Sequence, residues 1–507
     1  MAESVADIDR SEAAAPGGPP PAGPRTAAPL VVGAVLTAVL LSLAGRYGYH
    51  RDELYFLLCG RHLDWGYVDQ GPLVPALARL ADTIAPGNLV VLRTPSAFIG
   101  GAAVVLVAAT ARQFGAGRVA QTAAAVLAAT SGIVLAGGHL LSTTSVDLLV
   151  WLVAALCVVR VLRSGDTRWA LGAGLLNKPL PALLGVGLVA GLLIAGPRRL
   201  LRDRWVLAGA GVAALLAVPY AAWQAVHGFP QLDVAASIAD GDSSYSGRVD
   251  AVVLQFLIIS PFAVPVWVAG LVALLRRPSW AAYRSLAWAW LVVVVIVVVA
   301  GGKGYYDAPL LLVLTAAGVV PVVAWARRGA ARARQTLLVT GAVLMAASSA
   351  VLLLPTLPAD RLSGFVVAAN YDAGETIGWS EFADSVAAVH RALPPAERDR
   401  AVVLTGNYGE AGALARYGPD RGLPRAYSGH NSMATFGRPP DDADVVIVVG
   451  WSRPEPLRAW FTEVAEAGRV DQRADVDNDE NGEPILVARG LRRPWSQIWD
   501  TEVRHGS

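Results

Sequence analysis

Lysine is almost absent from this chain of 507 residues. Lys178 and Lys303 are the only two, and arginine supplies the rest of the 42 basic side chains. Cysteine is equally rare: Cys59 and Cys157 fall in a loop and in an apolar run, so neither a disulfide framework nor a cysteine metal site is supported. Charged residues make up only 16% of the chain and the formal net charge is +2, and we predict no nucleic-acid partner.

Apolar residues, in contrast, are abundant. They form 54% of the chain, whose mean hydropathy is +0.47, against about 45–50% in soluble domains. Eleven runs approach the length of about 20 residues that spans a bilayer, the fifth being short: 29–45, 89–111, 119–136, 140–159, 169–176, 179–196, 205–226, 251–275, 285–300, 306–326 and 336–354. The sequence therefore predicts an α-helical, multi-pass protein of the cell membrane, with a membrane domain over 29–354.

The distribution of arginine predicts an orientation. Residues 1–28 are rich in Pro, Ala and Gly and poorly charged, which is typical of a disordered cytoplasmic tail and not of a signal peptide. With that tail inside, 18 basic residues fall on the cytoplasmic side and 8 on the other, the C-terminal region excluded. Residues 355–507 are then extracytoplasmic. The prediction requires 169–196 to form a hairpin with its apex at 177–179, because losing the short fifth span would invert everything after it.

The segment 49–73, which follows the first apolar run, is dense in charged and aromatic residues: YHRDELYFLLCGRHLDWGYVDQGPL. Asp52, Glu53 and Asp69 are interleaved there with tyrosine, phenylalanine and tryptophan. This spacing predicts a short amphipathic helix in the headgroup plane, followed by a turn at 70–72 that returns the chain to the bilayer. Charge held at a membrane surface by aromatic side chains indicates a reaction centre.

Both lysines lie at the predicted outer edges of membrane helices, Lys178 in LLNKPL and Lys303 in GGKGYYDAPL. One interpretation is that their long side chains snorkel to the interface. The other is phosphate binding, because a chain that otherwise uses the planar fork of arginine offers a compact point charge at these two places. Tyr305 and Tyr306 favour the second interpretation for Lys303, since phenol hydroxyls help an ammonium to hold an anionic headgroup.

Polar residues inside the predicted spans are further candidates for a site. An aspartate such as Asp147 costs about 2.5–3.5 kcal/mol at a helix centre. We therefore expect it to line a polar cavity or, in the alternative, to cap or pair with a neighbouring helix. Arg93, just inside the second span, has the same two interpretations. His139, Trp151 and Trp223 are interpreted as ordinary interface or packing residues.

The region 355–507 has the pattern of a small α/β domain. We predict helices near 380–393, 409–417 and 455–467, and strands at 401–405, 444–449 and 484–489. Its acidic stretch resembles a calcium loop at Asp475, Asp477 and Asp479. Position six of such a loop is Glu480 instead of Gly, however, and position twelve is Leu486 instead of Glu. We therefore expect a solvated acidic loop, in a domain that covers the active site or recognises the acceptor.

Several of these segments resemble glycosyltransferase family 39, which includes the protein O-mannosyltransferases and the lipid A aminoarabinose transferases. The most specific likeness is in the first outer loop, where the Asp-Glu pair at 52–53 and DQGPL at 69–73 resemble the family's acidic pair and its Asp-x-Pro-Pro-Leu turn, with Gly in place of one Pro. The segments LRTPSAFIGG, SVDLLVWL, LLNKPLPALLGVGLVAGLL and GKGYYDAPLLLVL are similar to later parts of the family. WQAVHGFP and the C-terminal LTGNYGEAGALARYG resemble a bacterial, actinobacterial-looking branch.

The resemblance implies the C-type glycosyltransferase fold and a sugar donor linked to a polyprenyl phosphate. The residues agree, because displacing a lipid phosphate needs a base for the acceptor hydroxyl and cations for the departing charge. We assign Asp52 as the base, with inversion at the anomeric carbon, and Glu53 as the residue that orients the acceptor or a metal. Asp69 and Asp147 are expected to support the cavity. The expected phosphate contacts are Lys303, Tyr305, Tyr306, Arg93 and Lys178.

A transporter or flippase of lipid-linked sugars is the main alternative. Transporters usually place their charges at the membrane midplane and show repeated halves. Here most outer charges gather at one face and no internal repeat is visible. A sensor is less well supported, because no cytoplasmic output domain is present. The sequence leaves open the sugar, the acceptor (protein, glycan or lipid), the oligomeric state and any need for a divalent metal, for which no His/Asp/Glu spacing is diagnostic.

Overall fold

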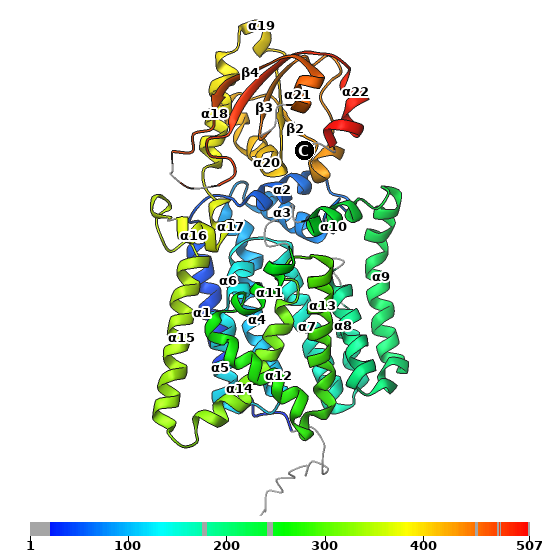
Figure 1. Cartoon of the computed structure of the whole chain (residues 1–507), viewed down its shortest axis with the longest axis vertical. Coiled ribbons are helices and arrows are strands. Elements are labelled where there is room, and N and C mark those ends of the chain that lie inside the picture. Colours follow the sequence, from blue (N-terminus) through cyan, green and yellow to red (C-terminus); the bar gives the residue numbers. More distant parts are fainter. Residues whose placement is uncertain are drawn as a thin grey trace, which may run out of the picture.

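A computed structural model describes residues 21–174, 180–240, 247–362, 364–451, 455–473, 476 and 478–504. Long helices run side by side as a bundle, and a small domain with a sheet sits on one end of it (Figure 1). The short helices α2 (Arg51–Arg61) and α3 (Leu73–Ile84) lie between the bundle and that domain (Figure 1). Lys178 and the predicted hairpin apex at 177–179 lie outside the described residues.

Six described helices are long and apolar enough to cross a membrane: α4 (Leu89–Gln113), α7 (Thr143–Ser164), α9 (Arg204–Val226), η4 with α13 (Pro278–Ala300), α14 (Ala308–Ala326) and α15 (Ala331–Leu353). Two bent segments, with breaks of 56° and 68°, raise the number to eight: α5 (Arg118–Ala129) with α6 (Gly132–His139), and α11 (Arg248–Leu257) with η3 and α12 (Pro261–Arg276). Two apolar helices are shorter: α1 (Ala28–Leu43) and α8 (Leu180–Ala195). The helices agree with a multi-pass membrane protein, but the predicted count of eleven spans is not confirmed.

The predicted fifth span, 169–176, is the clearest departure from the sequence-based count. Its described part is a 3₁₀ helix, η1 (Thr167–Gly174), which packs against α7 and α9. Eight residues that rise about 2.0 Å each cover about 16 Å, roughly half of the hydrocarbon thickness of a bilayer. This segment is therefore too short to cross a membrane as a 3₁₀ helix.

The sheet of the C-terminal domain has the strand order β2-β1-β3-β5-β4. β1 (Val402–Thr405), β2 (Ala426–Ser428) and β3 (Val445–Val449) are parallel, whereas β5 (Pro484–Leu491) and β4 (Phe461–Arg469) pair antiparallel. All five residues of β3 are buried, as is typical of a central strand covered on both faces. Smaller elements complete the chain: α10 (Pro230–Asp240), α16 (Gly364–Ala369), α17 (Tyr371–Gly374), α18 (Trp379–Ala392), α20 (Tyr408–Tyr417), η7 (Asn431–Thr435), α21 (Glu455–Trp460) and α22 (Trp495–Ile498).

Most of the elements predicted for this domain are confirmed within one or two residues, among them α18, β1, α20, β3 and β5. The predicted helix 455–467 is wrong in its second half, because α21 ends at Trp460 and the chain continues as β4. The residues of β4, FTEVAEAGR, include good helix formers. Pairing with β5, in which Val464 lies opposite Ala488, overrides this local preference.

The predicted helix after the first apolar run is present as α2, but its surroundings differ from those expected. It packs against α3 on one side and α20 of the outer domain on another. Seven of its eleven residues are buried, Glu53 among them. α2 is thus enclosed by protein, and it lies at the end of the bundle that carries the outer domain (Figure 1).

Candidate active site

The start of α2 is held by a capping box. The Nδ1 atom of His50 accepts a hydrogen bond from the backbone N–H of Asp52 (3.2 Å), and Glu53 Oε2 accepts one from the backbone N–H of His50 (3.0 Å). These contacts satisfy N–H groups that have no partner within the helix. They also fix the directions of Arg51, Asp52 and Glu53, and these three successive side chains meet different surroundings.

Glu53 is fully buried against Arg93 of α4. The guanidinium donates two hydrogen bonds to the carboxylate, from Nε to Oε1 (2.9 Å) and from Nη2 to Oε2 (2.8 Å). It also donates to the carbonyls of Ala44 and Gly48, at 2.8 and 2.7 Å, and Glu53 Oε1 accepts from the N–H of Leu141 (3.0 Å). Both charged groups are engaged by protein partners, and the pair joins α2 to the end of α1, to α4 and to the connection between α6 and α7.

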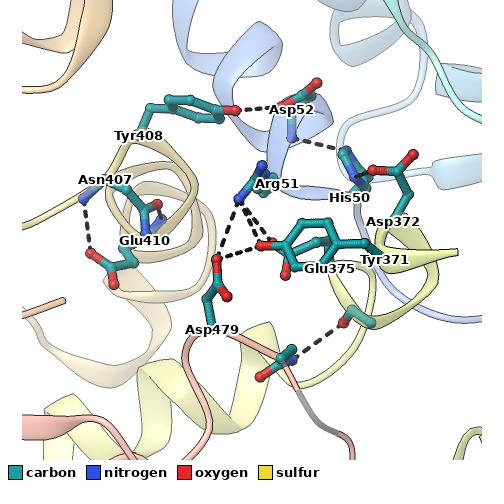
Figure 2. Close-up of polar contacts among 12 residues, drawn as sticks. His50, Arg51, Asp52, Tyr371, Asp372, Glu375, Asn407, Tyr408, Glu410 and Asp479 are labelled. Atoms are coloured by element: carbon teal, nitrogen blue, oxygen red, sulfur yellow. Dashed lines mark hydrogen bonds and ion pairs between the residues drawn. The ribbon is translucent and has the colours of Figure 1, made fainter. Parts of the chain in front are cut away.

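Asp52 is half-buried, and its partner comes from the outer domain. The hydroxyl of Tyr408, the first residue of α20, donates to Asp52 Oδ1 at 2.8 Å (Figure 2). Burial by itself raises the pKa of Asp52. Four neighbouring groups favour the charged form and outweigh the effect of burial, so the pKa of Asp52 lies below its usual value. These groups are His50, Arg51, the Tyr408 hydroxyl and Lys303. Asp52 is therefore ionised at neutral pH.

Arg51 connects α2 to the residues that follow the bundle. Its Nη1 donates to the Tyr371 hydroxyl (3.2 Å) and lies 3.4 Å from Glu375 Oε2 and 3.8 Å from Asp479 Oδ2. The Tyr371 hydroxyl donates in turn to Asp479 (Figure 2). The guanidinium also lies 5.3 Å from the ring centroid of Tyr371 and 5.9 Å from that of Tyr408, within the range of a cation–π interaction. Arg51 thus holds the outer domain directly beside Asp52.

Asp69 reaches the same region from the turn before α3. Its Oδ1 accepts a hydrogen bond from the Tyr55 hydroxyl (2.8 Å), and the rings of Tyr55 and Tyr408 have centroids 4.8 Å apart. Burial raises the pKa of Tyr408 well above its usual value, and the carboxylates of Asp52 and Asp69 raise it further. The two aspartates therefore lie close to the same tyrosine.

Asp147 lines a small pocket together with Tyr305 and Tyr306 from the loop between α13 and α14. The pocket is completed by Ile133, Thr144, Leu148, Trp151 and Pro309. Tyr305 is within electrostatic reach of both Asp147 and Asp52, and Lys303 is within reach of Asp52 and Tyr306. The pocket and the Asp52 carboxylate therefore form one polar region.

Six of the predicted site residues meet in this region: Asp52, Asp69, Asp147, Lys303, Tyr305 and Tyr306. Glu53 and Arg93 lie beside it as a buried pair, and Lys178 lies outside the described residues. Sequence reasoning gave no role to Tyr408, which is 356 positions from Asp52 although it lies in the segment LTGNYGEAGALARYG, and it gave none to Arg51. The density of charge in 49–73 was the only signal for Arg51.

The structure offers no ready metal site among its described residues, where no group of three or more His, Cys, Asp or Glu side chains is placed to hold an ion. Asp475 and Asp477 of the acidic stretch lie outside those residues. Asp479 contacts Arg51, and Glu480 is 1% exposed. The expected solvated acidic loop is therefore wrong for Glu480, which is enclosed by the domain.

Known proteins share parts of this sequence and its fold. Residues 69–223 match the family model for dolichyl-phosphate-mannose-protein mannosyltransferases, whereas no curated protein sequence gives a significant match. The structure of ArnT from Cupriavidus metallidurans bound to undecaprenyl phosphate is similar, with a TM-score of 0.55 and 16% identity over 92% of this chain and 98% of that one. Arabinofuranosyltransferase AftD from mycobacteria has a TM-score of 0.49 and 16% identity over 94% of this chain and 42% of that one.

The family match over 69–223 identifies the class of protein, which is a membrane glycosyltransferase. The match over 69–223 confirms the resemblance to family 39, and the likeness to ArnT confirms the expected fold. The predicted actinobacterial branch is not confirmed.

Proposed function

We propose that this glycosyltransferase moves a sugar from a polyprenyl-phosphate donor to an acceptor hydroxyl, with Asp52 as the general base. The observation that carries the proposal is the position of Asp52, an ionised carboxylate within electrostatic reach of Lys303 and Tyr305. A base and the groups suited to a departing phosphate therefore lie side by side. ArnT, which is similar in fold, has been solved with undecaprenyl phosphate bound, and this supports a lipid phosphate as the leaving group.

In the proposed reaction the acceptor O–H donates a hydrogen bond to Asp52 while its oxygen attacks the anomeric carbon. The bond from that carbon to the phosphate oxygen breaks, the polyprenyl phosphate leaves with the electron pair, and the proton passes to Asp52. Direct displacement inverts the anomeric carbon. Tyr408 donates to Oδ1 and so orients the carboxylate, and Lys303, Tyr305 and Tyr306 stabilise the phosphate charge.

For Glu53 and Arg93 we propose a supporting role in place of acceptor and phosphate contact. Each satisfies the charge of the other through two hydrogen bonds, and neither side chain is accessible. Because Glu53 is also part of the α2 capping box, the pair sets the position of the helix on which Asp52 is carried. Asp69 and Asp147 support the cavity, and Lys178 stays a predicted phosphate contact.

The proposed orientation puts residues 1–28 in the cytoplasm, 29–354 in the membrane and 355–507 outside. α2 and the outer domain are in contact and share one side, whereas the arginine-rich loop 327–330 lies at the other end of the bundle (Figure 1). With both native cysteines replaced by Ala, a cysteine at the exposed Thr435 should react with an impermeant thiol reagent in intact cells, and one at the exposed Ala330 should not. Reversed labelling would overturn the orientation.

Transfer is tested directly by incubating the purified protein in lipid nanodiscs with radiolabelled polyprenyl-phosphate sugars and membrane extract. We expect label to move from one donor into a product that is absent with Asp52→Asn. If the lipid-linked sugar only changes leaflet in proteoliposomes, without any sugar transfer, the protein is a flippase and the proposal fails.

A further inference from the structure

A second pocket, larger than the one at Asp147, lies between the loop that follows α2 and the C-terminal end of α9. Its empty volume, open solvent included, is about 600 Å³. Two tryptophans, an aspartate and a histidine supply its chemistry: Trp65, Trp223, Asp64 and His227. Pro219, Ala222 and Val226 of α9 complete the lining. The proposed reaction, as written, uses none of these residues.

Hydrogen bonds and ring stacking hold the wall of this pocket in place. Trp223 Nε1 donates to Asp64 Oδ2 at 2.8 Å, while Asp64 Oδ1 accepts from the N–H of Trp65 at 2.7 Å. The His227 ring stacks on Trp223, with centroids 4.0 Å apart and planes at 20°. Gly66 allows the close approach, because a Cβ there would meet the indole at 2.9 Å. The wall is therefore fixed before any ligand arrives.

The two tryptophans differ from simple membrane anchors. Trp223 is only 8% exposed, so its ring is packed within the protein, which agrees with the packing interpretation and not with the interface one. Trp65 is 66% exposed on the loop after α2 and is available to a ligand. An open indole beside a carboxylate and an imidazole matches a sugar ring, whose C–H face stacks on the indole while its hydroxyls bond to the polar groups.

Several polar groups lie between this pocket and the proposed base. Gln224, next to Trp223, donates to the carbonyl of Tyr67 (2.9 Å) and to the hydroxyl of Tyr220 (3.0 Å). Tyr220 is within electrostatic reach of Asp69, and Asp69 and Asp52 lie close to the same tyrosine, Tyr408. The Asp147 pocket meets Asp52 through different residues, Lys303 and Tyr305. Asp52 is thus within electrostatic reach of Lys303 and Tyr305 beside the first pocket, while Asp69 lies between Tyr220, near the second pocket, and Tyr408, which bonds Asp52.

We propose that the pocket of Asp64, Trp65, Trp223 and His227 is an acceptor subsite that binds one sugar ring of a glycan, while another residue of the same glycan presents its hydroxyl at Asp52. The inference rests on the proposed function and adds the class of acceptor, a saccharide of more than one ring. Trp65 supplies the stacking face, and Asp64 and His227 bond to hydroxyls.

Direct binding is measured by saturation-transfer NMR on the full chain in nanodiscs, with methyl glycosides of mannose, galactose and arabinose and their disaccharides as probes. We expect transfer to the ring protons of at least one disaccharide, reduced about fivefold or more in Trp65→Ala and largely restored in Trp65→Phe, which keeps a ring face. Trp169→Ala is the matched control, because Trp169 is also exposed, at 42%, but lies in η1. If no probe receives saturation from the protein, or if Trp65→Ala gives the same saturation transfer as the wild type, the subsite is overturned.

Kinetics separates this inference from the proposed function. With a lipid-linked donor, Trp65→Ala should raise the KM for a glycan acceptor about tenfold with little change in kcat, and the KM for the donor should stay as in wild type. If the wild type binds the disaccharide but consumes no donor, the proposed function fails and the saccharide site stands. If donor is consumed only with a serine-containing peptide, and Trp65→Ala behaves as wild type, the acceptor is a peptide and the subsite is refuted.

Discussion

Asp52 and Glu53 are adjacent in sequence and carry the same functional group, but the two sides of α2 on which they lie are built differently. Glu53 is enclosed with Arg93, its charge matched through two hydrogen bonds and its remaining contacts made by backbone N–H groups. Asp52 is half-buried, its carboxylate accepts a hydrogen bond from the Tyr408 hydroxyl, and Arg51 and Lys303 lie within electrostatic reach. One carboxylate is saturated by the protein, and the other keeps acceptor capacity.

This difference shows that the role of a charged residue depends on the groups that its side chain contacts, and not on its residue type alone. A buried ion pair contributes little net stability, but breaking it leaves an isolated charge and costs about 3–5 kcal/mol. A carboxylate with free acceptor capacity has the opposite character. It adds little stability to the fold, and it can accept a proton from a substrate. Four experiments test this contrast, taken from the largest expected effect to the smallest.

Asp52→Asn should lower turnover by roughly 10²–10⁴, the usual contribution of a positioned base, and leave the melting temperature near that of the wild type. The amide keeps the oxygen that Tyr408 bonds but cannot take a proton. Turnover is measured with radiolabelled donor, and Asp420→Asn, at an exposed residue of the outer domain, serves as control. Near-normal turnover in the first variant would remove Asp52 from the role of base.

Arg93→Met should destabilise the protein by about 3–5 kcal/mol, because Glu53 would be left buried without its cation. We expect a much lower melting temperature in detergent, or failure to accumulate in the membrane. The double variant Arg93→Met with Glu53→Leu removes both charges and should recover a large part of the loss. If Arg93→Met melts normally and only donor use suffers, Arg93 is a phosphate ligand after all.

Lys303→Gln should lower catalytic efficiency with the donor by roughly 10- to 150-fold, because a charge-assisted hydrogen bond is worth about 1.5–3 kcal/mol and 1.4 kcal/mol is a factor of ten. Its melting temperature should hardly change. Lys303→Arg should recover only part, since a planar fork does not replace a point charge. Wild-type donor use by both variants would mean that Lys303 only snorkels and that the phosphate is held elsewhere.

Glu410 provides a third case, a buried carboxylate without an arginine. Burial raises its pKa to about 8 from the usual 4.5. The folded state then keeps a proton that the unfolded chain loses above pH of about 4.5, so this residue's contribution to stability falls as the pH rises from about 4.5 to about 8. Glu410→Gln stays uncharged and retains an acceptor for the N–H of Asn407 (3.1 Å). This variant should flatten the dependence of the melting temperature on pH between about 4.5 and about 8. An unchanged slope would contradict the raised pKa of Glu410.

The sequence predicted the parts of this site that depend on local chemistry. The acidic pair in the first loop, the Lys303–Tyr306 segment and most elements of the outer domain follow from composition, spacing and a family likeness. Pairing was one of the two interpretations of Arg93, but Glu53 was not identified as its partner, because the two side chains are 40 positions apart and Glu53, taken alone, resembled a site residue. β4 was missed because its pairing with β5 outweighs the helix preference of its own residues. The fifth span was predicted but is not confirmed, because the described part of its apolar run forms the 3₁₀ helix η1.

The hydrogen bond from Tyr408 to Asp52 also has a consequence for biogenesis. α2 is synthesised well before the hydroxyl that orients its aspartate, which lies 356 residues later in the chain. Closing so long a loop comes late, after the intervening helices have inserted and packed. A nascent chain in the bilayer therefore carries most of the acidic and basic groups of the site without their final arrangement, and the site is completed only after Tyr408 has been synthesised.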